Sequence, residues 1–234
     1  MKIRLYSLLI VSLLVTFSCS PKNINKYGLT VISKEKEYSN LIKKDAKKKM
    51  VDVRKYLPAI LFDLRYATDD NFMKQQLYPH LQTTYVRLAA AEALKRANEK
   101  FLKVNLLIKI FDAYRPYAIT EQMWEQVHDA RYAADPAKGS GHNRGIAVDM
   151  TLLNRDTNKE LDMGTGFDNF SDTAHTDFQN LPAHVLQNRK TLINIMEQSG
   201  FKSLDTEWWH FYLNDAEKFE LLDLSFRQLQ RLTE

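Results

Sequence analysis

The sequence lacks the features that define several classes of protein. It contains a single cysteine, Cys19, so no intramolecular disulfide can form. No internal repeat or low-complexity tract interrupts its 234 residues. The formal net charge is only +4, which gives no case for binding to nucleic acid. The apolar run from Leu5 to Phe17 is too short for a comfortable membrane span.

The amino-terminus does contain the pattern of a signal peptide. Lys2 and Arg4 precede the apolar run, and Ser18-Cys19-Ser20 follows it. We therefore expect residues 1–18 to be a signal peptide and the protein to be exported to the cell envelope. The position of Cys19 predicts a lipoprotein that contacts the membrane only through a lipid on this residue. Because Thr16-Phe17-Ser18 departs from the usual lipobox, ordinary secretion is the alternative.

The rest of the chain divides by composition into a tether and one domain. With 44% hydrophobic and 26% charged residues, the chain has ordinary globular proportions. From Ser20 to about Met50 it is polar and rich in lysine, which is typical of a flexible linker. We therefore predict a lipid-anchored or flexible tether over residues 19–50 and a single domain over residues 51–234.

Two short segments of this domain supply the groups of a catalytic metal site. Residues 140–149 read Ser-Gly-His-Asn-Arg-Gly-Ile-Ala-Val-Asp, and residues 207–210 read Glu-Trp-Trp-His. A hydrolytic zinc has three protein ligands and a bound water whose pKa falls to about 7. His142, Asp149 and His210 can hold one such ion per chain. Glu207 is then the free carboxylate that accepts a proton from the attacking water.

The spacing of the first two ligands requires a turn between them. His142 and Asp149 are seven residues apart, and residues at odd separations in a regular strand point to opposite faces. Gly145 permits a turn because glycine adopts backbone conformations that are closed to other residues. After it, the alternation of residues 146–153 predicts a strand in which Asp149 faces away from the more apolar layer.

Glu207 and His210 raise the same problem at a separation of three. We expect a bend or a short loop at residues 206–207, followed by a strand from about Trp208 to Leu213. A regular strand through the whole segment would count against a shared site.

Apolar spacing predicts the elements that surround these segments. Residues 86–101, 120–130 and 184–199 have the period of amphipathic helices, the last ending at Gly200. Residues 106–111 read as a buried strand. The predicted class is α+β, with a small antiparallel sheet that presents the metal and helices packed against its other side.

Taken together, these motifs resemble a known family. The pattern Ser-x-His-x-x-Gly-x-Ala-x-Asp followed by Glu-x-x-His resembles the zinc D-Ala-D-Ala peptidases. Glu-Trp-Trp-His, with Asp-Ala-Tyr-Arg-Pro at residues 112–116, looks like the D-alanyl-D-alanine dipeptidases of the vancomycin-resistance (VanX) type, peptidase family M15. The resemblance runs from about Val51 to the C-terminus, and residues 63–72, 163–168 and 194–210 also match. It implies the fold of these peptidases, which is hedgehog-like.

The resemblance also assigns roles to residues outside the metal site. Arg115 would stabilise the oxyanion of the tetrahedral intermediate, Ser140 would bind the terminal carboxylate of the substrate, and Asp168 with Tyr66 would bind its free ammonium. Read without the resemblance, Ser140 is a turn residue, Asp168 a loop carboxylate and Tyr66 a core aromatic.

The expected activity is the hydrolysis of D-alanyl-D-alanine or a close D,D-dipeptide in the turnover of cell-wall peptides. The nearest alternative is a D,D- or L,D-carboxypeptidase or endopeptidase of peptidoglycan, which has the same chemistry in a more open pocket. A non-catalytic wall-binding lipoprotein that keeps zinc for stability is the third interpretation. It has no use for the free base Glu207 or for Arg115.

Overall fold

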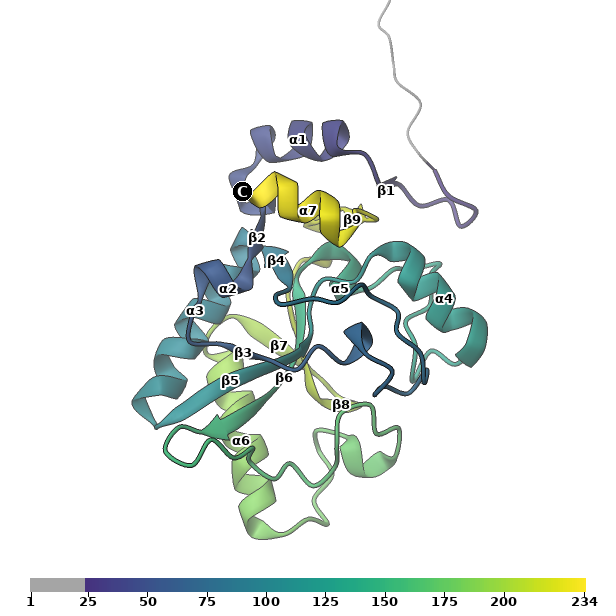
Figure 1. Ribbon diagram of the computed structural model, residues 1–234. Helices are drawn as coiled ribbons and strands as arrows, with labels where there is room; N and C mark the ends of the chain where they lie inside the picture. Colours follow the sequence, from purple (N-terminus) through teal and green to yellow (C-terminus); the bar gives the residue numbers. More distant parts are fainter. Residues whose placement is uncertain (1–23) are drawn as a thin grey trace, which may run out of the picture.

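A five-stranded sheet forms the centre of the molecule. The computed structural model describes residues 24–234, so the signal peptide and the lipidation expected at Cys19 lie outside the described residues. The strand order is β3-β5-β6-β8-β7 (Figure 1). The strands are β3 Leu61–Phe62, β5 Leu106–Asp112, β6 Ala147–Asn154, β7 Phe201–Leu204 and β8 Glu207–Leu213. The sheet is antiparallel as predicted, except that the edge strand β3 runs parallel to β5.

The central strand β6 brings polar residues of three strands into one row. Asp149 on β6 lies opposite Asp112 on β5 and opposite His210 on β8. The predicted strand over residues 146–153 is confirmed, shifted by one residue to Ala147–Asn154. Both of its faces are buried, because β6 has a neighbour on each side and packing above and below.

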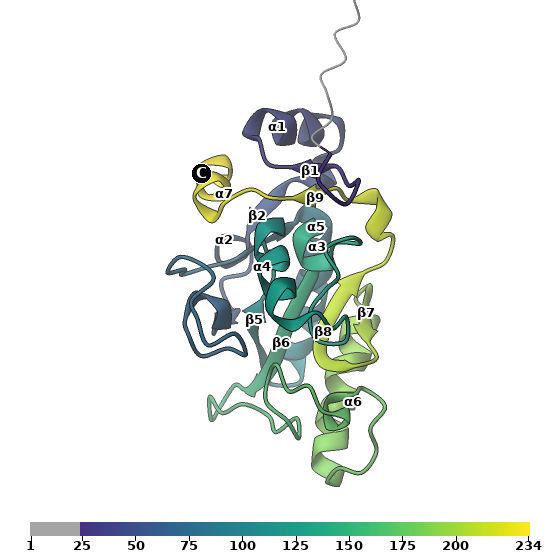
Figure 2. The same cartoon turned by 90° about the vertical axis from the view of Figure 1, so that its right-hand side faces the viewer.

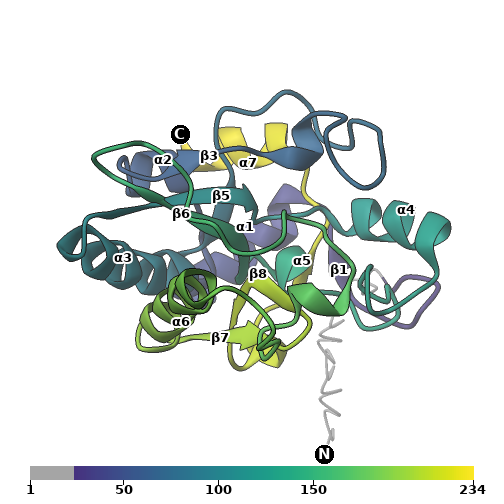
Figure 3. The same cartoon turned by 90° about the horizontal axis from the view of Figure 1, so that it is seen from below.

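Two long helices cover one face of the sheet. They are α3, Leu88–Lys103, and α6, Ala183–Glu197, which pack against each other and against β5 and β7 (Figure 3). Their apolar residues recur at helical spacing, as predicted. The buried residues of α3 are Ala90, Ala91, Ala93, Leu94, Ala97, Asn98 and Phe101.

Shorter elements complete the fold. Helices α4, Tyr117–Val127, and α5, Gly141–Arg144, lie side by side (Figure 2), joined by a hydrogen bond from Asn143 to Thr120. Helix α4 starts and ends three residues before the predicted helix. Strands β2, Met50–Asp52, and β4, Tyr85–Arg87, form an antiparallel pair, and two further helices are α2, Val53–Tyr56, and α7, Phe226–Thr233. No helix among residues 24–234 is long and apolar enough to cross a membrane.

The predicted flexible tether is wrong for residues 24–50, which fold onto the domain. Strand β1, Val31–Ile32, pairs in parallel with β9, Leu221–Leu222, and helix α1, Glu35–Lys44, packs beside α7 (Figure 1). Tyr38 of α1 is only 1% exposed, and its hydroxyl accepts the N–H of Met50. Tyr38, Leu41 and Ile42 lie on one helical face. Among residues 24–50, every lysine except Lys48 is exposed. These lysines dominate the composition and make the apolar face hard to see in the sequence.

Candidate active site

The turn between His142 and Asp149 is a single turn of helix, α5. Ser140 caps it: its Oγ accepts the N–H of Asn143 at 3.1 Å, while Asn143 Oδ1 accepts the N–H of Ser140 at 3.0 Å. Gly145 ends the helix with a φ of +69°, a conformation that favours glycine. The chain then enters β6 and carries Asp149 back beside His142.

Glu207 and His210 reach the same cavity because β8 is irregular. The turn precedes Glu207, and β8 begins at Glu207 rather than at Trp208 as predicted. The expected irregularity lies within the strand. The pairing of β8 with β7 shifts register between Ser203 and Leu204, so three residues of β8 have no partner on β7. Both side chains therefore border one cavity, with Glu207 Oε2 4.0 Å from His210 Nδ1.

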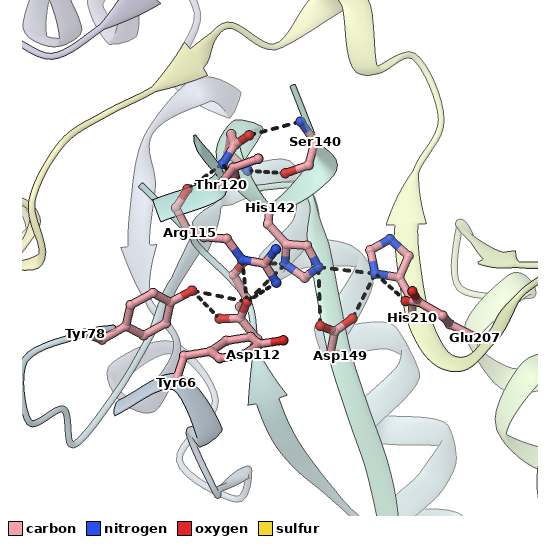
Figure 4. Close-up of polar contacts among 12 residues, drawn as sticks. Tyr66, Tyr78, Asp112, Arg115, Thr120, Ser140, His142, Asp149, Glu207 and His210 are labelled. Atoms are coloured by element: carbon pink, nitrogen blue, oxygen red, sulfur yellow. Dashed lines mark hydrogen bonds and ion pairs between the residues drawn. The ribbon is translucent and has the colours of Figure 1, made fainter. Parts of the chain in front are cut away.

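The three predicted ligands converge on one point (Figure 4). His142 Nε2 lies 3.2 Å from His210 Nδ1 and 3.3 Å from Asp149 Oδ2, and Asp149 Oδ1 lies 2.8 Å from His210 Nδ1. Donors around a tetrahedral zinc with bonds of about 2.0–2.1 Å lie about 3.3 Å apart. Two imidazole nitrogens and a carboxylate at these separations therefore fit a zinc ion.

A hydrogen bond orients His142, and charge keeps Asp149 ionised. His142 Nδ1 lies 2.6 Å from the carbonyl oxygen of Ala113 and donates to it, which directs the lone pair of Nε2 toward Asp149 and His210. Burial opposes ionisation of Asp149, but the two imidazoles hold the pKa of its carboxyl below the ordinary value. Asp149 is thus an anion before a metal arrives.

Glu207 is suited to act as a base. Its side chain is 18% exposed and belongs to the cavity wall. Burial raises the pKa of its carboxyl, and the nearby His210 opposes the rise. A carboxylate with a raised pKa accepts a proton more readily, as a general base must.

Arg115 follows the end of β5 and is held by a buried carboxylate. Its Nη2 and Nε donate to Asp112 Oδ2 at 2.8 and 3.2 Å, and its guanidinium carbon lies 5.1 Å from the centre of the Tyr66 ring. Tyr78 donates to the same carboxylate (Figure 4). Although burial disfavours the charge, Asp112 raises the pKa of Arg115 well above its usual range. The guanidinium is therefore a fixed cation at the cavity.

Asp168 and Tyr66 form the predicted pair. The Tyr66 hydroxyl lies 3.1 Å from each carboxylate oxygen of Asp168, and both side chains border the cavity. Burial, reinforced by the Asp149 carboxylate, raises the pKa of Asp168 well above its ordinary value. A carboxylate in this position gains from a cationic partner.

One cavity of about 340 Å³ collects all eight predicted site residues of the domain. They are Tyr66, Arg115, Ser140, His142, Asp149, Asp168, Glu207 and His210. Sequence reasoning gave no role to Asp112, Tyr78 or Asn143, although Asn143 ties α5 to the Arg115 carbonyl at 2.9 Å. For Asp112 a signal existed, since it is a charged residue at the end of an apolar strand.

Comparison with known proteins agrees with these motifs. The family profile described as D-Ala-D-Ala dipeptidase, peptidase M15, matches residues 46–230. A D-alanyl-D-alanine dipeptidase of Escherichia coli K12 is 34% identical over 173 residues, which covers 74% of this chain and 89% of that protein. One of Streptomyces coelicolor is 31% identical over 182 residues, or 70% of this chain and 90% of that protein.

Among solved structures, the chain is similar to the vancomycin-resistance D,D-pentapeptidase VanY in complex with Zn(II). The TM-score is 0.38 and the sequence identity 12%, over 58% of this chain and 76% of that one. A likeness this weak supports no functional comparison.

Proposed function

The chain belongs to the D-Ala-D-Ala dipeptidase family, peptidase M15, and on this basis we propose that it hydrolyses D-alanyl-D-alanine, or a close D,D-dipeptide, to free amino acids. One observation carries the proposal. Three metal donors, a free carboxylate and a fixed guanidinium border one cavity of about 340 Å³. This volume lies at the small end of ligand pockets, which span about 300–1,000 Å³. It suits a small substrate.

The cofactor we propose is one zinc ion held by His142, Asp149 and His210. The donor set and the spacing of its atoms support this assignment. Zinc in such a site supplies a Lewis acid for the scissile carbonyl and lowers the pKa of a bound water to about 7.

The reaction consumes one water and needs a proton to move from it to the departing amine. Glu207 borders the cavity next to His210 and would accept this proton, then deliver it to the amine as the C–N bond breaks. Arg115 would donate hydrogen bonds to the carbonyl oxygen as that oxygen becomes negative. Asp112 keeps the guanidinium of Arg115 in one orientation.

Two further groups would bind the ends of the dipeptide. The Asp168 carboxylate, with the Tyr66 hydroxyl, would receive the free ammonium. Ser140 would bind the terminal carboxylate. Its Oγ accepts the N–H of Asn143, which leaves the hydroxyl proton available to donate. Binding at both ends would restrict the substrate to two residues.

One observation favours the alternative of a peptidoglycan carboxypeptidase or endopeptidase. A second cavity of about 120 Å³ adjoins the first and shares Arg131, Tyr132, Phe170, Thr206 and Glu207 with it. In that alternative, the second cavity would hold the chain that precedes the last two residues of a longer peptide.

The distinguishing experiment is hydrolysis by zinc-loaded protein that begins at Ser20 and keeps every described residue. The substrates are D-Ala-D-Ala, L-Ala-L-Ala and N-acetyl-D-Ala-D-Ala. We expect cleavage of the free D,D-dipeptide alone. Cleavage of the acetylated substrate would assign the protein to the carboxypeptidases, and cleavage of none would contradict the enzymatic proposal.

We also propose that the protein is exported and anchored in the cell envelope by a lipid on Cys19, where it would meet dipeptide released from the wall. Support comes from the signal-peptide pattern of residues 1–18 and the position of Cys19. Ile24, the first described residue, is five residues from Cys19, and five residues span at most about 18 Å. Labelling with a radioactive fatty acid, lost in Cys19→Ser, tests the anchor.

A further inference from the structure

The first described segment, residues 24–33, precedes the part that the family profile matches, residues 46–230, and is nevertheless folded. Asn25 organises its turn: the Oδ1 atom accepts the backbone N–H groups of Tyr27 and Leu29, each at 3.0 Å. The chain then continues into β1, which pairs with β9. The segment is thus held by its own turn and by the sheet edge.

A chain of two hydrogen bonds leads from this segment toward the cavity. Asn25 Nδ2 donates to the Tyr117 hydroxyl at 2.9 Å, and that hydroxyl donates to the Pro136 carbonyl at 2.7 Å. Tyr117 is 3% exposed. Burial raises the pKa of its hydroxyl to about 12, so the proton that bonds to Pro136 stays in place at neutral pH. The hydroxyl donates its single proton to the Pro136 carbonyl and accepts the Asn25 N–H with a lone pair.

An apolar contact reaches the same loop by a second route. Val31, Tyr117 and Leu221 form a small buried cluster that is separate from the main core. Leu221 also packs against Gly139, so closely that a Cβ at this glycine would lie 2.4 Å from Leu221 Cδ2. Gly139 has a φ of +67°. The backbone of the loop therefore lies directly on the side chain of Leu221, which belongs to β9, the strand that pairs with β1.

The loop that receives both contacts is a wall of the cavity. Residues 130–134, with Gly139 and Ser140, border the cavity. Pro136 lies between these two groups, and Gly139 leads into Ser140, which caps α5. No helix or strand ladder fixes residues 128–140. Ala133 is buried in the main core and the Tyr132 ring packs on Phe170, so the contacts at Pro136 and Gly139 are what hold the second half of the loop.

We propose that residues 24–33 are a brace that fixes this wall of the substrate cavity, and that Asn25 and Tyr117 are positioning residues for substrate binding. The reacting groups do not belong to this loop. His142 is on α5, Asp149 is on β6, and Glu207 and His210 are on β8, while Arg115 follows β5. Loss of the brace should therefore leave the reacting groups in place and loosen only the wall. A wall that is ordered for a smaller fraction of the time binds substrate more weakly. This kinetic consequence rests on the proposed dipeptidase activity.

Two variants of the full chain remove the polar link and keep the rest. Tyr117→Phe keeps the ring in the apolar cluster and removes both hydrogen bonds. Asn25→Asp keeps the acceptor for its own turn and removes the donor to Tyr117. We expect the KM for D-Ala-D-Ala to rise about three- to tenfold in each, the range for one or two lost hydrogen bonds. The kcat and the zinc content should stay within about twofold of the unmodified protein.

The matched control is Lys26→Ala. Lys26 is in the same segment and pairs with Glu121 of the same helix α4 at 3.2 Å, but this side chain is 61% exposed and the pair does not reach the loop. An exposed ion pair contributes little. Its removal should leave KM unchanged.

Amide hydrogen exchange supplies a readout that needs no activity. The N–H groups of residues 137–139 bond to Asp135, and we expect them to exchange faster in Tyr117→Phe than in Lys26→Ala. The brace would be contradicted if amide exchange in Tyr117→Phe were unchanged. It would also be contradicted if kcat and zinc content fell by as large a factor as KM rose. Faster exchange in a protein that cleaves no dipeptide would support the brace and contradict the proposed function instead.

Discussion

The Arg115 guanidinium lies 2.8 Å from the carboxylate of Asp112, and both side chains are almost fully buried. Tyr78 donates to the same carboxylate from the other side. Asp112 also belongs to β5, opposite Asp149 of β6. The cation that we propose stabilises the oxyanion is thus held by the strand next to the one that carries Asp149, a proposed metal ligand.

This pairing predicts unequal losses of activity in two variants. Arg115→Lys keeps the charge but not the planar fork of donors, and kcat should fall about 10²–10³-fold, as for a lost oxyanion donor. Asp112→Asn keeps a hydrogen-bond acceptor and should cost about tenfold in kcat, with KM nearly unchanged. Steady-state kinetics on both, with the exposed Arg227→Lys as control, test this. A larger loss in Asp112→Asn than in Arg115→Lys would contradict it.

Glu207→Gln should remove the base and keep the metal. We expect kcat to fall about 10²–10⁴-fold, the usual contribution of general acid–base catalysis. The zinc content, measured by elemental analysis, should not change, because the three donors are other residues. The exposed Glu217→Gln is the control. If Glu207→Gln keeps more than a tenth of the activity, the base is another group.

Removal of the metal should lower both activity and stability. A ligand that binds only the folded state stabilises it, by about 4 kcal/mol at a thousand times its dissociation constant. Dialysis against a chelator should therefore abolish turnover and lower the melting temperature, and zinc should restore both. Magnesium, which prefers oxygen ligands, should restore neither. His210→Ala should behave like the chelated protein and show no response to zinc.

The sequence predicted the convergence of the site well because the information is local. The odd spacings of His142 from Asp149 and of Glu207 from His210 required chain irregularities. The structure contains both, as the helical turn that ends at Gly145 and as the register shift of β8. The three amphipathic helices were predictable for the same reason, since their periods are written in consecutive residues.

What the sequence did not reveal depends on contacts between distant segments. The role of Asp112 follows from Tyr78 and Arg115 meeting at its carboxylate. The folded state of residues 24–50 follows from β9, almost two hundred residues later, pairing with β1. The lysine-rich composition of this segment led to the prediction of a tether. No local pattern in the sequence indicates that a sheet edge and α7 cover Tyr38 and its neighbours.

Phe170→Ala should relax the length limit of the substrate. Phe170 borders both the main and the adjoining cavity, with its ring centre 4.6 Å from that of Tyr132 and 5.2 Å from that of Phe72. Removing it should open space for an N-acyl group. We expect kcat/KM for N-acetyl-D-Ala-D-Ala, relative to the free dipeptide, to rise at least about tenfold, as for other changes of pocket size. Phe178→Ala, in the same loop region but outside both cavities, should not change this ratio.

Asp168→Asn should make the protein more stable and less active. Burial raises the pKa of Asp168 in the fold, so at neutral pH the folded state either carries a disfavoured charge or takes up a proton that the unfolded state does not hold. The amide removes this cost, and the variant should have the higher free energy of unfolding at pH 7.5. The advantage should vanish as the pH falls below about 4, the ordinary pKa of an aspartate, where the carboxyl is protonated in both states.

The same substitution removes the charge that would pair with the substrate ammonium, so kcat/KM should fall about 10–100-fold, as for a lost charge-assisted hydrogen bond. Urea unfolding of the metal-free protein at several pH values measures the effect on stability, and steady-state kinetics on the zinc-loaded protein measure the effect on activity. Asn169→Ala, at the adjacent exposed residue, is the control for both. A variant that gains stability and keeps its activity would show that Asp168 does not bind the ammonium. A variant that loses both stability and activity would show that Asp168 has a structural role. A carboxylate that is kept to bind a cationic ligand would instead destabilise the protein without its substrate and stabilise the complex.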